Sequence, residues 1–278
     1  MAKTAKAFAP AKINLTLHVT GQRDDGYHLL DSLVVFADVG DRISVRPGGE
    51  FSLAVKGLYS GCIPAAQSNL VWKAAEWFGT PPVEITLHKE LPPSSGIGGG
   101  SSDAAAVIRA LSEAFDVPLP EAKDTAALGA DVPVCMEPRP TRMQGIGDIL
   151  TPAPALPPLH MVLANPKREV STPEVFQKLP SKRNPPMSES FPEWRDTAEF
   201  AAWLSEQRND LEDPARSICP AVGVTLARIQ DTDGCLIARM SGSGATCFGL
   251  YETSVQAEAA RDRISQQHPD WWVVACAS

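Results

Sequence analysis

Residues 92–102 read Pro-Pro-Ser-Ser-Gly-Ile-Gly-Gly-Gly-Ser-Ser, and this stretch says more about the fold than any other part of the chain. Four of the five residues from 96 to 100 are glycine, so their backbone N–H groups are uncovered and free to converge on an anion. An alternating strand at 83–87 precedes the stretch, and apolar residues at helical spacing follow it over 103–115. The start of that predicted helix favours a phosphate without any lysine, because its first N–H groups are unpaired and its dipole is positive there.

The serines at the end of this glycine loop leave several interpretations open. Ser101 and Ser102 can cap the helix, bind a phosphate oxygen or face Mg²⁺. A flexible turn capped by serine is the plain alternative, but the position between a strand and an alanine-rich helix favours nucleotide binding. The sequence has neither GxxxxGK[ST] nor GxGxxG here, which disfavours P-loop and dinucleotide folds. Asp103 would repel a nearby phosphate, so we expect it to point away from the ligand.

Periodicity predicts the remaining elements. Alternation over 13–19 indicates a half-buried strand with Lys12 on its polar face, and two runs around a Pro/Gly turn indicate a hairpin over 43–55. A short helix over 69–78 begins after Ser68, a candidate N-cap, and ends at Gly79. The other predicted elements are helices over 172–178, 221–229 and 255–266, strands near 245–251 and 271–276, and an exposed loop over 180–193.

The length of 278 residues predicts one large or two fused α/β domains, and we expect two domains that share a cleft. A stretch rich in proline and glycine, 138–158, marks the boundary, so we predict an N-terminal domain over 1–152 and a C-terminal domain over 153–278. Hydrophobic residues make up 44% of the chain, as in globular proteins. The net charge of −8 and the absence of any lysine or arginine run argue against a nucleic-acid or membrane-surface binder.

The six cysteines contain no CxxC pair, so neither zinc spacing nor a disulfide framework is indicated, and we interpret them as reduced. No stretch is apolar over the length needed to span a bilayer, and the lysines of the first eleven residues are not followed by a signal-like apolar run. These features predict a cytoplasmic protein.

Three segments in this order, residues 10–15, 96–102 and 242–246, resemble the three motifs of the galactokinase, homoserine, mevalonate and phosphomevalonate (GHMP) kinase superfamily. A narrower resemblance, to the 4-diphosphocytidyl-2-C-methyl-D-erythritol kinases of the non-mevalonate (MEP) isoprenoid pathway, spans nearly the whole chain. It is carried by residues 21–30 (GQRDDGYHLL), 129–133 (GADVP), 145–148 (GIGD), 209–212 (NDLE) and 240–246 (MSGSGAT).

This resemblance implies an α+β fold of two domains with a cleft between them, and an ATP-dependent kinase that phosphorylates the 2-hydroxyl of diphosphocytidyl methylerythritol with Mg²⁺. The family's catalytic pair corresponds to Lys12 and Asp131, and its ATP loop to Pro92, Pro93, Ser94, Ser95, Gly96, Ile97, Gly98, Gly99, Gly100, Ser101 and Ser102, with Asn69 and Leu70 near the adenine. Its diphosphocytidyl pocket corresponds to Asn14, Tyr27, His28, Thr172 and Phe176. The partners implied are small molecules, for a monomer or homodimer, and the protein ligand of the metal stays open.

Each of these residues also has a plain structural interpretation. Lys12 on its own would be a solvated lysine on a strand, and Asp131 a helix cap or a turn residue before proline. In the kinase interpretation, Asp131 accepts the hydroxyl hydrogen bond and orients the acceptor, while the ammonium group of Lys12 stabilises the developing alkoxide. His28 alone would be a partly buried histidine, Thr172 a cap and Phe176 a packing residue.

Two rival functions remain at this point. One is another kinase of the superfamily, acting on mevalonate, homoserine or a sugar. The other is a catalytically silent binding protein on the same fold, which would keep the glycine loop but lack the Lys12 and Asp131 pair. Residues 242–244 are either a tight turn or a second glycine segment at the phosphate site, and the neighbouring Ser241 and Thr246 favour the site.

Overall fold

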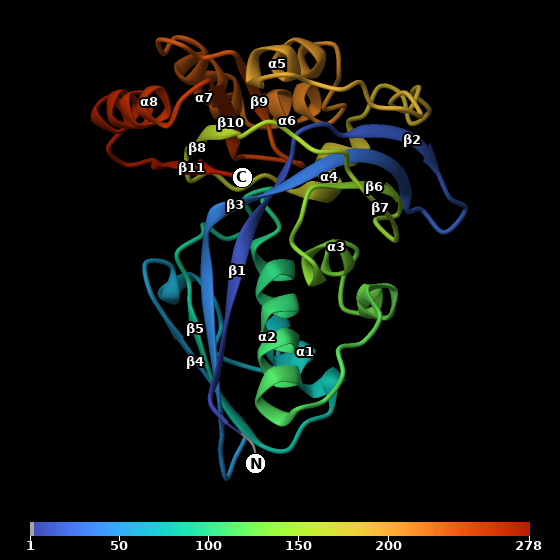
Figure 1. Ribbon diagram of the computed structural model, residues 1–278, viewed down its shortest axis with the longest axis vertical. Helices are drawn as coiled ribbons and strands as arrows, with labels where there is room; N and C mark the ends of the chain where they lie inside the picture. Colours follow the sequence, from blue (N-terminus) through green and yellow to red (C-terminus); the bar gives the residue numbers. More distant parts are fainter. Residues whose placement is uncertain (1–2) are drawn as a thin grey trace. The chain divides into compact units, whose positions relative to one another are not determined.

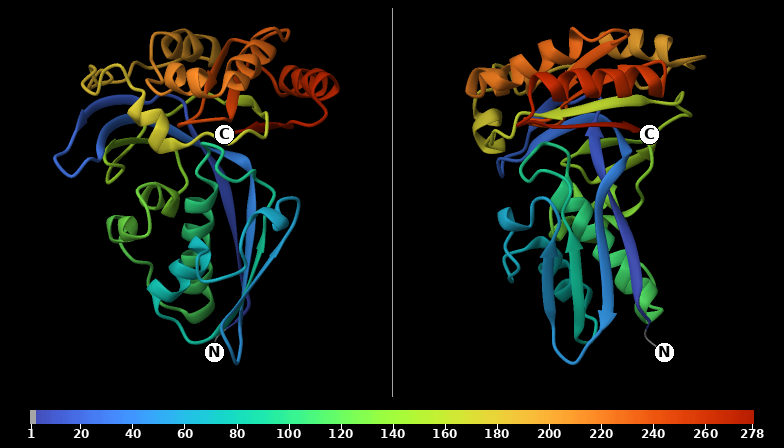
Figure 2. Two further views of the ribbon diagram at one scale, coloured as in Figure 1. Left: turned by 180° about the vertical axis from the view of Figure 1, so that it is seen from behind. Right: turned by 90° about the vertical axis from the view of Figure 1, so that its left-hand side faces the viewer.

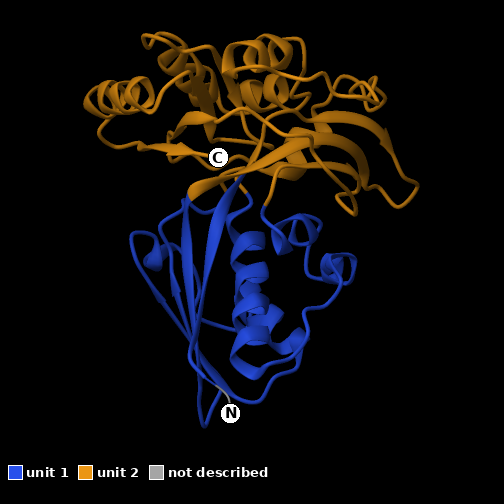
Figure 3. Cartoon of the chain, viewed as in Figure 1, with its two compact units in different colours: residues 1–12, 39–93, 98–138 blue, residues 13–38, 94–97, 139–278 orange. Residues whose placement is uncertain are grey.

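The computed structural model describes residues 3–278 and contains two compact units (Figures 1 and 3). Unit 1 consists of the chain up to Lys12 together with Val39–Pro93 and Gly98–Pro138. Unit 2 consists of Ile13–Asp38, Ser94–Ile97 and Arg139–Ser278. The chain therefore passes from one unit to the other five times, and the predicted domain boundary after residue 152 stays a prediction.

Unit 1 packs helices against one side of its strands (Figure 1). Strand β5 (Val83–His88) is the middle strand: it pairs antiparallel with the second half of β3 (His28–Pro47) and parallel with β4 (Ser52–Lys56). Helices α1 (Leu70–Phe78) and α2 (Gly99–Phe115) pack against each other. The apolar residues of β5 are buried at every second position, as the sequence predicted for 83–87.

The remaining elements of unit 1 are short. Residues from β1 (Ala5–Asn14) up to Lys12 belong to it, as do the 3₁₀ segments Ser60–Cys62 and Ala122–Ala127 and helix α3 (Val132–Met136). Ten residues of α2 are buried, and alanine is the commonest of them, which lets α1 approach closely.

The predicted hairpin over 43–55 is wrong. Strands do occupy both halves, but β4 pairs only with β5, which inserts between β4 and β3. The residues of a turn predict only that it joins two strands. Whether those two strands pair with each other depends here on a third strand, β5, about thirty residues further on, and the local pattern does not reveal it.

Helix α1 begins and ends close to the predicted positions. Its N-cap is Asn69 rather than Ser68, because the Asn69 side chain accepts a hydrogen bond from the Val71 N–H group. Gly79 ends the helix with φ of 75°, a left-handed conformation that glycine adopts without strain.

Unit 2 has an antiparallel four-stranded sheet in the order β11-β8-β10-β9, with helices on one side of it (Figures 1 and 2). The strands are β8 (His160–Asn165), β9 (Ile237–Met240), β10 (Cys247–Tyr251) and β11 (Trp272–Ala277). The helices are α4 (Thr172–Gln177), α5 (Thr197–Ser205), α6 (Glu212–Ile218), α7 (Pro220–Gln230) and α8 (Ser254–Gln267).

The first half of β3 belongs to unit 2 and pairs with β2 (His18–Gln22) and β6 (Thr141–Gly145), and β6 pairs with β7 (Ile149–Pro152). The predicted strand over 13–19 is divided between β1 and β2, and it is not half-buried: all seven residues are buried. The polar members have buried partners instead of water. For example, the Thr16 hydroxyl accepts a hydrogen bond from the Leu33 N–H group, and the Asn14 amide donates to Ser32.

The predicted helices and strands of the C-terminal half are confirmed as α4, α7, α8, β10 and β11, each within about two residues. Strand β8 was not identified because its four central residues, MVLA, are continuously apolar rather than alternating, as befits a strand paired on both sides. Among residues 3–278, no helix is long and apolar enough to cross a membrane.

The loop over 180–193 contains no helix or strand, as predicted, but it is not exposed throughout. Met187 is buried, and its N–H group donates to the buried Asp31 carboxylate. Asp31 also binds the Arg142 guanidinium through both oxygens, at 2.8 and 2.7 Å, and Arg142 donates to carbonyl groups of the loop. This Asp31–Arg142 pair holds the middle of the loop against β3 and β6.

We expect Arg142→Met to lower the free energy of unfolding by about 3–5 kcal/mol, because it leaves the Asp31 charge buried without a cation. Urea denaturation measures the change. The double variant Asp31→Asn with Arg142→Met should lose less stability than the single variant. Arg228→Met, which removes an exposed pair with Asp231, should change stability by less than about 1 kcal/mol. A similar loss in the Arg142 and Arg228 variants would contradict this assignment.

Candidate active site

The Lys12 and Asp131 side chains form an ion pair in unit 1. The Lys12 Nζ atom lies 2.7 Å from an Asp131 carboxylate oxygen, with the lysine side chain 4% exposed and the aspartate side chain 37% exposed. Lys12 is thus not a solvated lysine. Asp131 occupies the N-cap position of α3, but its side chain makes no capping hydrogen bond. The carboxylate is therefore held by the lysine and remains open to solvent on one side.

The glycine loop approaches this ion pair at Gly98. A Cβ atom at Gly98 would lie 3.2 Å from both Cβ and Cε of Lys12, and the residue has φ of 62°. Position 98 therefore favours glycine for its backbone conformation, and any side chain there would press against Lys12. The loop backbone and the Lys12 side chain consequently lie in contact beside Asp131.

Helix α2 begins four residues earlier than the sequence predicted. Gly98 is its N-cap, and Gly99, Gly100 and Ser101 form the first turn. Their N–H groups have no acceptor in a preceding turn, whereas the Ser102 N–H group donates to the Gly98 carbonyl. The sequence pattern does not predict this first turn, because glycine is a weak helix former. The glycines are thus the positive end of a helix of 17 residues.

The preceding part of the loop, residues 94–97, belongs to unit 2 and is fixed by the segment 241–246. Gly96 has φ of 76°, and a Cβ atom there would lie 2.5 Å from the Ser241 carbonyl oxygen. The Ser241 hydroxyl donates to the Gly96 carbonyl, and the Thr246 N–H group donates to the Ser95 carbonyl. Residues 242–244 therefore form a turn that packs directly on the glycine loop, and their place at a phosphate site stays a prediction.

A buried group of three charges lies under the start of α2. The Lys89 ammonium contacts Asp41 and lies 2.7 Å from Asp103, and all three side chains are buried. Asp41 also accepts hydrogen bonds from the N–H groups of Glu90 and Leu91, which fixes the chain entering the loop. Asp103 lies in the interior, bonded to this lysine. The three groups carry one excess negative charge when both carboxylates are ionised.

Burial raises the pKa of Asp103 to about 8, although the Lys89 ammonium acts in the opposite direction. Burial alone would lower the pKa of Lys89, but the carboxylates of Asp103 and Asp41 outweigh it and raise that pKa. Protonation of Asp103 at neutral pH therefore leaves a balanced pair of Lys89 and Asp41.

The predicted substrate residues all belong to unit 2, where two of them stack. The rings of His28 and Phe176 have centroids 4.4 Å apart and planes 22° apart. Burial, with a smaller effect of Lys182, lowers the pKa of His28, so its ring is neutral at pH 7. Its Nε2 atom is buried and has no hydrogen-bond partner among the described residues. Tyr27 precedes it with 58% of its surface exposed.

The other predicted ligand residues have partners within the protein. The hydroxyl groups of Thr172 and Ser243 lie 2.7 Å apart, which ties α4 to the 242–244 turn. Asn14 is buried, and its backbone N–H group donates to the Ser241 hydroxyl. In unit 1, Asn69 caps α1 and donates to the Pro64 carbonyl, and Leu70 is the first residue of that helix.

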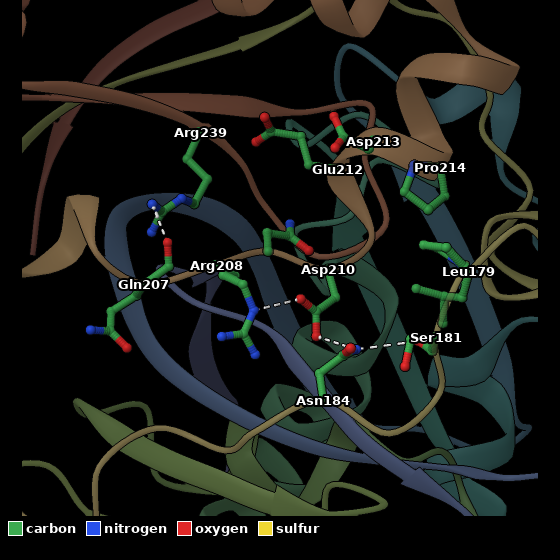
Figure 4. A pocket seen from close by; sticks show the side chains of 12 residues that line it. Leu179, Ser181, Asn184, Gln207, Arg208, Asp210, Glu212, Asp213, Pro214 and Arg239 are labelled. Carbon is green, nitrogen blue, oxygen red and sulfur yellow. Dashed lines mark hydrogen bonds and ion pairs between the residues drawn. The ribbon is translucent and has the colours of Figure 1, made fainter.

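A pocket of about 340 Å³ in unit 2 contains none of the predicted site residues (Figure 4). Arg208 and Asn184 point toward Asp210 there and bind its carboxylate. Asn209, from the NDLE segment, donates to the carbonyls of Met240 and Gly242. We interpret Asn209 as a residue that positions the 242–244 turn. The sequence had flagged the segment only through its resemblance, because such a long-range contact leaves no local pattern.

Two family descriptions match the chain: "GHMP kinases N terminal domain" over residues 69–151 and "GHMP kinases C terminal" over residues 187–270. A 4-diphosphocytidyl-2-C-methyl-D-erythritol kinase from Dinoroseobacter shibae is 55% identical over 96% of this chain and 92% of that protein. One from Ruegeria pomeroyi is 52% identical over 96% of both. The chain belongs to the 4-diphosphocytidyl-2-C-methyl-D-erythritol kinase family of GHMP kinases. The predicted family, fold class and small-molecule kinase activity are thereby confirmed.

Solved structures agree with this placement. A crystal structure of a 4-(cytidine 5′-diphospho)-2C-methyl-D-erythritol kinase has a TM-score of 0.80 and 31% identity, covering 98% of each chain. The homoserine kinase from Cytophaga hutchinsonii has a TM-score of 0.63 at 17% identity and covers 100% of this chain and 95% of that chain, which shows the shared fold alone. The rival of a catalytically silent protein has less support, since Lys12 and Asp131 are both present and paired.

The raised pKa of Asp103 makes stability depend on pH. Between about pH 4 and 8 the folded chain holds a proton on Asp103 that the unfolded chain has released. The contribution of Asp103 to the free energy of unfolding is therefore complete below pH 4 and falls as the pH rises toward 8. We expect Asp103→Asn to remove this dependence. The difference in unfolding free energy between the variant and the unsubstituted protein should therefore shift in favour of the variant by at least about 1 kcal/mol when the pH is raised from 5 to 8.5.

Urea denaturation at both pH values measures the difference, with the exposed Asp124→Asn as the control that should show no such change. Parallel pH profiles for Asp103→Asn and the unsubstituted protein would show that Asp103 is ionised throughout.

Proposed function

We propose that this chain transfers the γ-phosphoryl group of ATP to the 2-hydroxyl of 4-diphosphocytidyl-2-C-methyl-D-erythritol. The names of its relatives support the substrate, and one observation supports the chemistry: the Lys12–Asp131 ion pair in contact with the glycine loop at Gly98. Phosphoryl transfer needs an oriented hydroxyl and stabilisation of charge on the phosphoryl oxygens, and it needs no covalent intermediate. An ion pair beside a phosphate-binding loop supplies both.

Residues 92–102 hold the nucleotide in this proposal. The N–H groups of Gly99, Gly100 and Ser101 point away from α2 with no helical acceptor, and they donate to the terminal phosphates. Glycine at these positions lets the phosphates approach the backbone. Asn69 and Leu70, at the start of α1, lie near the adenine in the proposal carried over from the family.

Asp131 and Lys12 act on the acceptor oxygen. The Asp131 carboxylate is more exposed than the lysine, so it can accept a hydrogen bond from the substrate hydroxyl and orient it toward the γ-phosphoryl group. The Lys12 ammonium then stabilises negative charge on the attacking oxygen and on the transferred group. Because the transition state is loose, we rank positioning of the hydroxyl above complete proton abstraction.

Mg²⁺ fits this arrangement as an ion held mainly by ATP. No group of three or more His, Cys, Asp or Glu side chains within residues 3–278 forms a metal site, but Mg²⁺ with nucleotides commonly uses only one or two protein oxygens. The Ser102 hydroxyl, in the first turns of α2, is buried without a hydrogen-bond partner and is a suitable ligand. The ion would neutralise charge on the phosphates.

The cytidine is recognised by residues of unit 2. A neutral His28 has one donor and one acceptor nitrogen, which suits the acceptor and amine edge of cytosine, and its Nε2 atom has no partner within the described chain. Tyr27 and Phe176 offer aromatic faces for the base. Thr172 and Asn14 complete the pocket as polar residues.

Six free cysteines support a reducing location, in keeping with the predicted cytoplasmic one.

We expect Asp131→Asn to bind ATP normally but to lower kcat by about 100-fold or more, since the amide orients the hydroxyl poorly and no longer balances Lys12. ADP release measures turnover, and isothermal titration measures ATP affinity. Asp124→Asn, an exposed acid of the same unit, is the control. Turnover within twofold of the unsubstituted protein would remove Asp131 from the mechanism.

We expect phosphorylation of the diphosphocytidyl substrate but not of methylerythritol, mevalonate, homoserine or galactose, because the cytidine contacts contribute to transition-state binding.

His28→Phe keeps the stack on Phe176 but removes the ring nitrogens, so KM should rise about tenfold, equivalent to ~1.4 kcal/mol. His268→Phe is a matched control, because His268 is also stacked, on Trp271 at 3.9 Å. Equal use of substrates with and without cytidine would overturn the proposed substrate.

A further inference from the structure

The uncovered side of the unit 1 sheet carries a groove that the kinase chemistry does not use. In Figure 2, right, strands of this sheet face the viewer, with α2 behind them. The groove has a volume of about 580 Å³. Its lining comes from four strands and the second residue after β5, and it consists of Lys6, Ala7, Phe8, Arg42, Ile43, Ser44, Lys56, Thr86, His88 and Glu90.

Three basic side chains form a row across the groove. In the sheet register, His88 on β5 is paired with Arg42 on β3 and with Lys56 on β4. Residues paired in this way point to the same face, and their Cβ atoms lie about 4.5–5.5 Å apart. Lys6, from β1, adds a further cation to the lining, and the one carboxylate is that of Glu90.

In the described part of the chain, the cations of this groove lie outside the protein's ion pairs. Across residues 3–278, Lys6, Arg42 and Lys56 form no ion pair. On the same pair of strands, β3 and β5, the arginine four positions after Arg42 does have an acidic partner: Arg46 is paired in register with Glu84 and forms a salt bridge with it. The sheet therefore pairs a cation with an acid at one end, whereas at the other end Arg42 and Lys56 are both paired with His88.

Arg42 and Lys56 lie on either side of His88 with no acid opposite them, so the row presents cationic groups that the pairing of the strands does not use. Lysine on an edge strand can prevent sheet-to-sheet association, which would account for Lys56 on β4. It does not account for Arg42, because β3 is an interior strand paired with β5. Nor does composition account for the row, because the chain as a whole has a net charge of −8.

The chemistry of the lining selects the ligand. Arginine and lysine bind phosphate oxygens through charge-assisted hydrogen bonds, and the hydroxyl groups of Ser44 and Thr86 lie in the next register row. Neighbouring strands are about 4.8 Å apart, so the row spans about 10 Å, which suits two or three linked phosphates and is too short a track for a nucleic acid. Phe8, with 38% of its surface exposed, adds an aromatic wall.

We propose that this groove is a second anion site, which binds a small molecule bearing a diphosphate or triphosphate group at the Arg42–His88–Lys56 row. The site lies on residues of unit 1 other than those of the proposed kinase site, and the inference does not depend on the proposed substrate. A bound polyphosphate supplies the negative charge that the register partners of Arg42 and Lys56 do not.

Histidine NMR tests the proposal on the intact chain, because only five histidines contribute signals. Inorganic pyrophosphate and tripolyphosphate are titrated at constant ionic strength, and the imidazole signal that disappears in His88→Gln reports on the groove. We expect a saturable shift of the His88 signal, with weaker binding of orthophosphate. In the double variant Arg42→Gln with Lys56→Gln, the midpoint should rise about tenfold or more, which corresponds to ~1.4 kcal/mol.

Arg46→Gln is the matched control, since it removes a positive charge from the same strand outside the groove and should leave the midpoint unchanged. Unchanged signals of the other histidines will show that the double variant is folded. A linear or absent response of His88, or an equal loss of binding in Arg46→Gln, would overturn the proposal. A tighter response to a single-stranded oligonucleotide than to tripolyphosphate would overturn its assignment to a small molecule.

Discussion

The contact between the Gly98 backbone and the Lys12 side chain is the constraint on which the proposed chemistry depends. It fixes how closely the glycine loop approaches a buried ammonium group, which lies 2.7 Å from the Asp131 carboxylate. Gly98 satisfies two demands at once, a left-handed backbone and the absence of a side chain. Removing either glycine or lysine would therefore disturb the other, since each occupies space that the other defines.

Buried charge recurs throughout the chain, and in each described case it is matched by neighbouring groups. Lys89 lies between two carboxylates, Arg142 binds Asp31 through two hydrogen bonds, and Arg239 donates to the carbonyls of Leu15, Leu204 and Gln207. These groups join segments that are far apart in sequence, so they specify which loops lie together at the cost of desolvation. At the basic row of Arg42, His88 and Lys56, by contrast, no carboxylate is paired in register with the cations.

The sequence pattern predicted those helices and strands whose determining residues all lie within about fifteen positions of one another. The capped helix α1, the alternating strand β5 and the helix after the glycine loop follow from spacing, caps and breakers. The start of α2 was misplaced because glycines disguise a first turn, and the hairpin over 43–55 was wrong because β5 pairs between its two halves. The Lys12–Asp131 pair came from resemblance alone: 119 positions separate the two residues (131 − 12), and only the folded chain brings them together. The roles of Asn209 and of the Lys89 group depend on such long-range contacts and have no local signal.

The repeated passage of the chain between its two units bears on how the protein is made. Residues 13–38 belong to the second unit, yet their partners emerge from the ribosome much later: the Val19 N–H group bonds to Asp210, 191 positions further on. At about 5–20 residues per second, synthesis leaves this apolar stretch waiting for roughly 10–40 s. During that interval its exposed apolar surface is open to unwanted association, because unit 2 is completed only when synthesis reaches its last residues, whereas the residues of unit 1 already end at Pro138.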